Sequence, residues 1–295
     1  GNVALSEGGK TVEPYFNIEI PAIMGVMSAL VLAFVLGIGL SKIKNSAMLK
    51  VAEEFNQIVL MIVTNVLIPL VPIYIGCVFA KLSYSGEIFN TLKSFGIVYV
   101  LLFALQLTYI CIQYCIAGAI KKQNPFKLIK NMVPAYMTAV GTQSSAATIP
   151  VTLQCVKKND VNEEVLDFVV PLGATIHLAG DTITLVLTSM AVMYMNGQTP
   201  TFGMIMPFIF MLGVTMVAAP GVPGGGVMAA LGLLESMLGF GAIEKPIMIA
   251  LHAAQDSFGT ATNVTGDGAI AILVDYIINK KKGNSISKED KVISA

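Results

Sequence analysis

The sequence predicts an all-α membrane fold, a polytopic helical bundle, and two observations support this class. The chain of 295 residues is 55% hydrophobic and only 12% charged, with a mean hydropathy of +0.76. Soluble domains usually carry about twice that charged fraction. Uncharged stretches cover residues 20–40, 58–80 and 95–120, and each is long enough to cross a hydrocarbon core, which needs about 20 apolar residues.

Lysine placement predicts the orientation in the membrane. All 18 positive charges are lysines, and the chain contains no arginine. One set of helix ends carries Lys42, Lys44, Lys50, Lys121, Lys122, Lys127, Lys130, Lys157, Lys158, Lys280, Lys281, Lys282, Lys288 and Lys291, and the other set carries only Lys10, Lys81, Lys93 and Lys245. By the positive-inside rule the richer side is cytoplasmic. We therefore expect a multi-pass protein of the cell membrane with a cytoplasmic C-terminus, and the formal net charge of +0 gives no indication of a nucleic-acid partner.

The first part of the chain shows no chemistry in its pattern. Residues 1–16 are polar and expected to be extracellular, and residues 17–120 are predicted to form scaffold-type transmembrane helices. Within that region, spans are expected at 17–40, 57–80 and 95–119, with a cytoplasmic connection at 42–56. Residues 280–295 form a cytoplasmic tail, and the four cysteines match neither a disulfide framework nor a metal motif.

Residues 121–279 form a core in which polar segments interrupt apolar ones. The stretch NPFKLIKNMVPAYMTAVGTQSSAATIPVTLQCVKK, residues 124–158, has lysines at both ends and a small, hydroxylated centre. Unwound backbone at membrane depth survives only where it is buried in protein or faces a cavity. This pattern predicts a re-entrant hairpin that enters and leaves on one side, with its tip at Ser144–Ser145.

A second interrupted segment, residues 201–240, contains AAPGVPGGG and has flanks poor in lysine, which predicts a hairpin from the opposite side. Helices at 166–195 and 246–279 follow the two hairpins. The order hairpin, helix, hairpin, helix is an inverted repeat, and such repeats place a solute site near the midplane. The alternative is that Gly and Pro merely kink ordinary helices.

The last helix carries a row of polar residues in the stretch AAQDSFGTATNVTGDGAIAILVDYI. Asp256, Thr260, Asn263 and Asp267 are spaced by four, three and four, so they share one helix face. A carboxylate inside a membrane needs a partner or water, and no lysine or arginine lies in these spans. A bound cation or a substrate ammonium is the natural partner, and the alternative is a structural hydrogen-bond network. His177 in the preceding span is more often a satisfied buried histidine than a ligand.

The motifs SSAATIPVT, PLGATIHLAGD, GVPGGG and NVTGD resemble, in order and spacing, the dicarboxylate/amino acid:cation symporters, a glutamate-transporter-like family. The resemblance covers nearly the whole chain from about residue 17, and QDSFGTATN is most similar to the bacterial serine/threonine sodium symporter branch. The resemblance is to the C-terminal part of the family fold, so we expect about three N-terminal spans to lie outside this chain. It implies an elevator-type transporter, not an enzyme, acting as a homotrimer in the lipid bilayer.

The resemblance also implies site residues. The substrate-binding residues would be Ser144, Ser145, Asp181, Val222, Gly226, Asp256, Thr260 and Asn263. The sodium ligands, in two sites, would be Gly173, Thr175, His177, Met216, Val217, Ala219, Asn263 and Asp267. Asp256 would bind the substrate ammonium, Asn263 and the first hairpin tip its α-carboxylate, and the second hairpin tip would be the lid. Of the metal ligands, Asp267 alone would use a side-chain carboxylate, and the others would use backbone carbonyls.

Departures from the family pattern bear on the substrate. Members that carry acidic substrates have an arginine where this chain has Gly259, or at the first hairpin tip, where it has Gln143. Asp181 stands where the family usually has threonine, so it should repel an acidic side chain. His177 and Ala179 replace a family asparagine and aspartate, which puts a third sodium site in doubt.

These features predict sodium-coupled symport of small neutral amino acids such as serine, threonine or alanine, with Na⁺ as the coupling ion. Within this class the rivals are an acidic amino acid or dicarboxylate symporter, and proton coupling through His177 or Asp181. From other classes, an intramembrane hydrolase using Ser144, His177 and Asp181 lacks the Gly-x-Ser-x-Gly motif. A channel or a non-transporting interaction partner is the remaining alternative.

Overall fold

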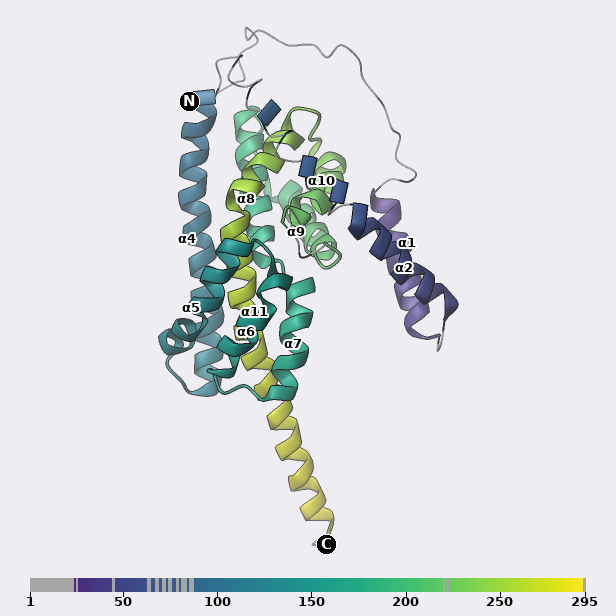
Figure 1. The fold of residues 1–295 in the computed structure, drawn as a ribbon, viewed down its shortest axis with the longest axis vertical. Helices are drawn as coiled ribbons and strands as arrows, with labels where there is room; N and C mark the ends of the chain where they lie inside the picture. The colour runs from purple at the N-terminus through teal and green to yellow at the C-terminus, as the bar shows by residue number, and fades with distance from the viewer. Residues whose placement is uncertain are drawn as a thin grey trace. The chain divides into compact units, whose positions relative to one another are not determined.

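The computed structural model describes residues 24, 26–43, 46–62, 88–219, 221 and 223–293, with isolated positions between residues 65 and 84. Helices dominate, and the described residues contain no strand. The helices are α1 Val26–Ser41, α2 Ala47–Ile62, α4 Ile88–Lys121, α5 Pro125–Thr142, α6 Ser145–Lys157, α7 Glu163–Ile176, α8 Ala179–Met195, α9 Phe202–Met216, α10 Gly225–Leu238 and α11 Glu244–Ile293 (Figure 1). The all-α class predicted from the sequence is confirmed.

Within the part of the chain that the structure describes, three helical stretches are long and apolar enough to cross a membrane. They are Phe95–Lys121, Glu163–Met195 and Glu244–Lys280, and shorter apolar helices cover Val31–Ser41, Phe202–Met216 and Gly225–Leu238. Membrane entry of the two helical hairpins from opposite sides stays a prediction. Of the second predicted span, at 57–80, the structure describes residues 57–62 and scattered positions beyond them, so this span stays a prediction.

The chain divides into two compact units, and each is described by itself. Residues 100–184 and 255–295 form the first, which we call the polar-row unit because it holds Asp256, Thr260, Asn263 and Asp267. Residues 1–99 and 185–254 form the companion unit. The boundaries fall inside α4, α8 and α11.

In the polar-row unit, α5 and α6 form a helical hairpin. The side chain of Asn124 caps α5 by accepting from the backbone N–H of Phe126 at 2.9 Å, and α5 ends where Gln143 adopts a left-handed conformation with φ of 51°. Ser144 then caps α6, because its side chain accepts from the N–H of Ala147 at 3.2 Å. The start of α5 and the end of α6 lie at the same end of the unit (Figure 1). The turn therefore falls at the small, hydroxylated centre of the sequence.

Apolar contacts hold this hairpin against α4, α7 and α11. The largest fully buried side chains of the cluster include Tyr114, Leu128, Met132 and Ile272. The hydroxyl of Tyr114 donates to the carbonyl oxygen of Thr265 at 2.8 Å, which satisfies its polar end inside the core. A large buried aromatic that also hydrogen-bonds to α11 fixes the register of α4 against that helix.

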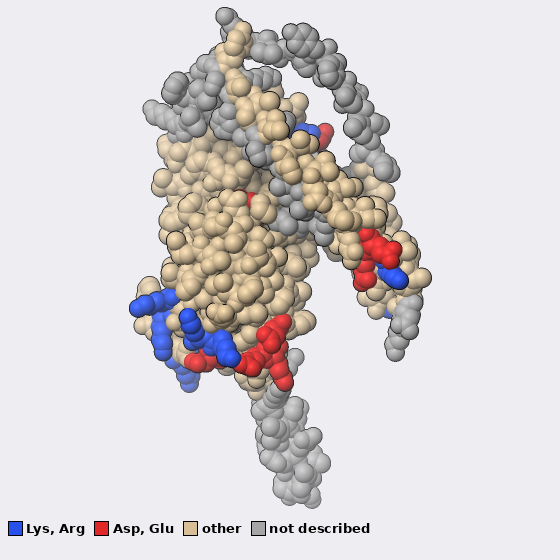
Figure 2. Space-filling model, in the orientation of Figure 1, with Lys and Arg blue, Asp and Glu red and all other residues tan. Residues whose placement is uncertain are grey.

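Charged side chains of the polar-row unit gather at the end where α4 finishes and α5 begins (Figure 2). The exposed charged residues of this unit include Lys122, Lys127, Lys130, Lys157, Lys158, Asp160, Glu163, Glu164 and Asp167. Lys157 and Glu163 form an exposed ion pair, which contributes little to stability because water and salt screen it. The sharp change from charged end to apolar sides fits an end at a membrane surface.

The companion unit contains the second helical hairpin, α9 and α10. Gly224, with φ of 73°, precedes α10, and Gly239, with φ of 70°, ends it. The N–H of Phe240 donates to the carbonyl of Leu234 at 3.1 Å, which closes the helix end in the usual glycine-dependent way. The expected connection at 42–56 is partly helical, because α2 begins at Ala47.

Candidate functional site

The polar row lies on the buried face of α11. Asp256, Thr260, Asn263 and Asp267 are 6%, 4%, 2% and 1% exposed. The hydroxyl of Thr260 lies 3.4 Å from Oδ1 of Asp256, one turn earlier on the helix. The spacing of four, three and four thus places all four side chains inside the protein, where a charge requires a partner.

The span predicted as one helix over 166–195 is interrupted, which corrects the sequence-based expectation. α7 ends at Ile176, and α8 begins at Ala179 after His177 and Leu178. The N–H of His177 still donates to the carbonyl of Gly173 at 2.8 Å, but its ψ of 88° ends the helix. A break of this kind leaves N–H groups at the start of the next helix without intrahelical partners.

Asn263 supplies the partner for this broken helix. Its Oδ1 accepts from the N–H of Gly180 at 2.7 Å, and its Nδ2 donates to Oδ2 of Asp181 at 2.6 Å. A Cβ on Gly180 would fall on the carbonyl group of Gly259, so the first turn of α8 packs directly on the backbone of α11. Asn263, which is expected to hold the α-carboxylate of the substrate, therefore also fixes the position of the start of α8.

Two buried carboxylates lie close together in this region. Asp181 is 4% and Asp256 is 6% exposed, and a carboxylate oxygen of one lies within 4.8 Å of a carboxylate oxygen of the other. Two like charges at this distance repel each other unless a cation or an ammonium lies near them. The tertiary structure thus brings together two residues that the sequence separates by 75 positions.

A second polar cluster surrounds Asp267. Nδ1 of His177 lies 2.9 Å from Oδ1 of Asp267, and Nε2 of the same ring lies 3.4 Å from the hydroxyl of Tyr109. The amide of Gln113 donates to that hydroxyl at 2.9 Å. Asp267 also lies against Gly173, because a Cβ built on this glycine would be 2.7 Å from Cγ of Asp267.

The oxygen donors of this cluster are of the kind that would suit a sodium ion. Gly173 leaves room for the Asp267 carboxylate to lie against the backbone of α7, and a side chain at that glycine would fill the space. A carboxylate together with backbone carbonyls is an all-oxygen set of the kind that hard cations prefer. Asp267, Gly173, His177 and Asn263 therefore remain candidate ligands of one ion.

The first hairpin tip approaches the start of the polar row. Nε2 of Gln143 donates to Oγ of Ser257 at 2.9 Å, which ties the turn between α5 and α6 to α11 next to Asp256. Ser145 is 7% exposed, and Ser144 is half-buried. The structure therefore brings the predicted tip and the predicted ammonium-binding carboxylate into one region.

The remaining predicted residues are divided between the two units. Thr175 is exposed in the polar-row unit, whereas Met216, Val217, Ala219 and Gly226 belong to the companion unit. Val222 lies outside the described residues. The second sodium site, for which Thr175, Met216, Val217 and Ala219 were the expected ligands, and the lid at the second hairpin tip therefore stay predictions.

Sequence reasoning missed Tyr109 and Gln113, which lie in a span expected to serve only as scaffold. The signal was present: Gln106, Tyr109 and Gln113 follow a spacing of three and four in an otherwise apolar helix. Such a spacing places them on one helix face. Gln106 donates to Oγ1 of Thr184 at 3.2 Å, so this polar face of α4 points toward α8 and the break before it.

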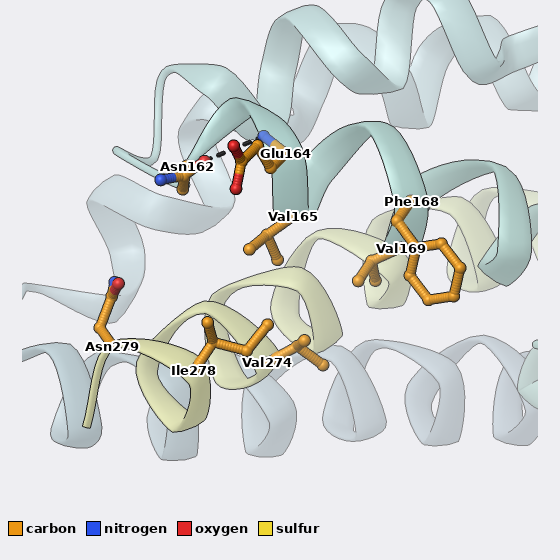
Figure 3. A pocket seen from close by; sticks show the side chains of 8 residues that line it. All are labelled: Asn162, Glu164, Val165, Phe168, Val169, Val274, Ile278 and Asn279. Carbon is orange, nitrogen blue, oxygen red and sulfur yellow. Dashed lines mark hydrogen bonds between the residues drawn. The ribbon is translucent and has the colours of Figure 1, made fainter. Parts of the chain in front are cut away.

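A pocket elsewhere in the polar-row unit is separate from the predicted binding residues. It has a volume of about 250 Å³ and lies between the first turns of α7 and a late segment of α11 (Figure 3). Its lining residues are Asn162, Glu164, Val165, Phe168, Val169, Val274, Ile278 and Asn279. Oδ1 of Asn162 accepts from the N–H of Glu164 at 2.9 Å and so caps α7. None of the predicted site residues lines this pocket.

The described helices include several that are long and apolar enough to cross a membrane, and comparison with known proteins gives the family. The model of the sodium:dicarboxylate symporter family matches residues 3–277. The chain belongs to this family, whose members are transporters rather than enzymes.

Curated relatives carry the names of amino acid transporters. Excitatory amino acid transporter 1 of Ambystoma tigrinum is 30% identical over 182 residues, which are 59% of this chain and 33% of the relative. Excitatory amino acid transporter 1 of Homo sapiens is 29% identical over 181 residues, with the same two shares. Neutral amino acid transporter A of Homo sapiens is 29% identical over 174 residues, 58% of this chain and 32% of the relative. The match thus spans about a third of the length of these relatives.

Proposed function

We propose that the protein carrying this chain is a sodium-coupled symporter of small neutral amino acids of the serine, threonine or alanine type. The observation that carries the proposal is the pair of buried carboxylates, Asp181 and Asp256, beside a hairpin tip in a chain without arginine. The relatives include proteins named excitatory and neutral amino acid transporters, so the choice of substrate rests on these residues.

The charge of the site favours an ammonium and disfavours a second carboxylate. Asp256 would bind the substrate ammonium, and Asn263 with Ser144 and Ser145 would hold its α-carboxylate. A side-chain carboxylate about 5 Å from Asp181 would be repelled by about 3 kcal/mol at an effective dielectric constant of about 20. That energy corresponds to an affinity loss of about 100-fold. Neutral hydroxylated or small apolar side chains avoid this penalty.

The proposed sodium site supports coupling between sodium binding and substrate binding. Asp267 with the carbonyls of Gly173, His177 and Asn263 would hold one ion, and bound sodium would supply the positive charge that a carboxylate only 1% exposed requires. Asn263 belongs to both predicted sites, and its side chain also holds the start of α8. Substrate and sodium should therefore each raise the affinity of the other, because both act on the same residues.

An elevator mechanism, a homotrimer, a plasma-membrane location and a cytoplasmic C-terminus complete the proposal. The two re-entrant hairpins would close the site from opposite sides, with residues 220–226 as the lid. The lysines gathered at one end of the polar-row unit support a cytoplasmic placement of that end (Figure 2).

Uptake by the purified protein in liposomes tests the proposal. With an inward sodium gradient, labelled serine should accumulate, and replacing external sodium by choline should abolish accumulation. Asp256→Asn should lose uptake while keeping its helical content and its sodium-dependent thermal shift, because only the ammonium loses its partner. Serine uptake that is unaffected by sodium removal would contradict the proposal.

The same assay separates the two rivals in this class. Unlabelled aspartate should compete at least about 100-fold less effectively than serine, given the repulsion from Asp181. Strong competition by aspartate would instead indicate an acidic amino acid or dicarboxylate symporter. Uptake driven by an inward proton gradient without sodium would indicate proton coupling.

A further inference from the structure

In the cluster around Asp267, a series of hydrogen bonds leads to the carboxylate, and each group donates to the next. A carboxylate can only accept, so the ring nitrogen that faces it, Nδ1 of His177, carries the hydrogen. In the neutral ring Nε2 is then an acceptor, and the hydroxyl of Tyr109 donates to it. Gln113 in turn donates to the oxygen of Tyr109. This series of hydrogen bonds therefore runs from α4 through the imidazole of His177 to Asp267 on α11.

Packing around the ring leaves it little freedom. His177 is 14% exposed in its side chain and Asp267 only 1%. A Cβ on Gly266 would lie 2.8 Å from Oε1 of Gln113 and would also overlap Cε1 of the imidazole. Gly266 thus makes room for the ring, and Gly173 makes room for the carboxylate on its other side.

The backbone break contributes to this arrangement. His177 occupies the first non-helical position after α7, with φ of −99° and ψ of 88°. It contacts residues on two other helices, Tyr109 on α4 and Asp267 on α11. The histidine thus connects three elements around one carboxylate.

We propose that His177 is a positioning residue for sodium binding: its imidazole fixes the Asp267 carboxylate against Gly173, in the orientation in which it would bind the ion. This inference rests on the proposed function, since it concerns the same sodium site. Residues that hydrogen-bond a ligating carboxylate orient it and pre-set its affinity, and their removal typically weakens metal binding by about 10- to 100-fold.

The test measures sodium binding apart from transport. The thermal unfolding midpoint of the purified protein is followed as sodium replaces choline at constant ionic strength, which gives a half-saturating concentration. His177→Ala should raise this concentration by about 10- to 100-fold. In liposomes the same variant should need about 10- to 100-fold more sodium than the wild-type protein for half-maximal serine uptake.

Two matched variants distinguish positioning from packing. His177→Asn should restore sodium affinity to within about 3-fold of wild type, because its amide nitrogen is bonded to Cγ as Nδ1 is and can donate to the Asp267 carboxylate. Tyr109→Phe removes the long contact to Nε2 and the acceptor of the Gln113 amide, but leaves the contact between Nδ1 and Asp267 in place, and it should change the affinity by less than about 3-fold. Wild-type or higher sodium affinity in His177→Ala would overturn the proposal.

A further variant decides the question if His177→Ala does not fold. His177→Gln places its amide one bond farther from the backbone and should bind sodium at least about 10-fold more weakly than His177→Asn. Equal affinity of these two variants would overturn the positioning role. If the wild-type protein itself shows neither a sodium-dependent midpoint nor sodium-dependent uptake, the proposed function fails, and this inference fails with it.

Discussion

Replacement of Gly180 by alanine tests the contact between α8 and α11. A Cβ at this position would lie 2.8 Å from the carbonyl carbon of Gly259 and 2.9 Å from its Cα. Carbon atoms in contact are about 3.5 Å apart, and the carbonyl oxygen of Gly259 would lie closer still to this Cβ, so the two helices would have to separate by about 1 Å. The hydrogen bond from Gly180 to Oδ1 of Asn263, now 2.7 Å, would lengthen past about 3.5 Å, beyond the length of a useful bond.

The expected cost follows from these two effects. Overpacking against backbone costs about 1–3 kcal/mol, and weakening a buried hydrogen bond adds about 1 kcal/mol. We expect Gly180→Ala to lower the free energy of unfolding by about 2–4 kcal/mol, which corresponds to a fall in Tm of roughly 4–16 °C. The result should be visible in thermal unfolding followed by circular dichroism in detergent.

A control in α4 separates this contact from the general effect of alanine in a helix. A Cβ on Gly96 would meet nothing within 4 Å, so Gly96→Ala should be neutral or slightly stabilising. A Tm for Gly180→Ala equal to that of wild type or of Gly96→Ala would refute the close contact between α8 and α11.

Two other substitutions probe the buried polar clusters. Gly173→Ala should abolish the sodium-dependent rise in Tm, because its Cβ would displace the Asp267 carboxylate, and a titration with sodium at constant ionic strength measures this; an unchanged rise would place the ion elsewhere. Asn263→Leu should lower unfolding stability by about 2–4 kcal/mol, since it leaves the N–H of Gly180 and the carboxylate of Asp181 without this partner. Chemical denaturation at matched sodium concentration would show the second effect, and wild-type stability would contradict the capping role of Asn263.

The sequence by itself determined the membrane class, the family and the shared face of the polar row. Apolar runs of about 20 residues have few alternatives to transmembrane helices, because each backbone polar group must find its partner within the segment. Spacing alone placed Asp256, Thr260, Asn263 and Asp267 on one side of a helix, since helical periodicity is a local property. Small hydroxylated residues and the lysines on both sides of them located the first hairpin turn near Ser144.

Only the tertiary structure decided which polar groups meet. The break after Ile176 was not apparent in the sequence, because the side chain that meets the N–H of Gly180 beyond it belongs to Asn263, more than 80 positions away. The approach of Asp181 to Asp256, and of Tyr109 to His177, likewise depends on helix packing at glycines such as Gly180 and Gly259. Long-range contacts of this kind depend on how helix surfaces fit together, and local sequence patterns do not encode that fit.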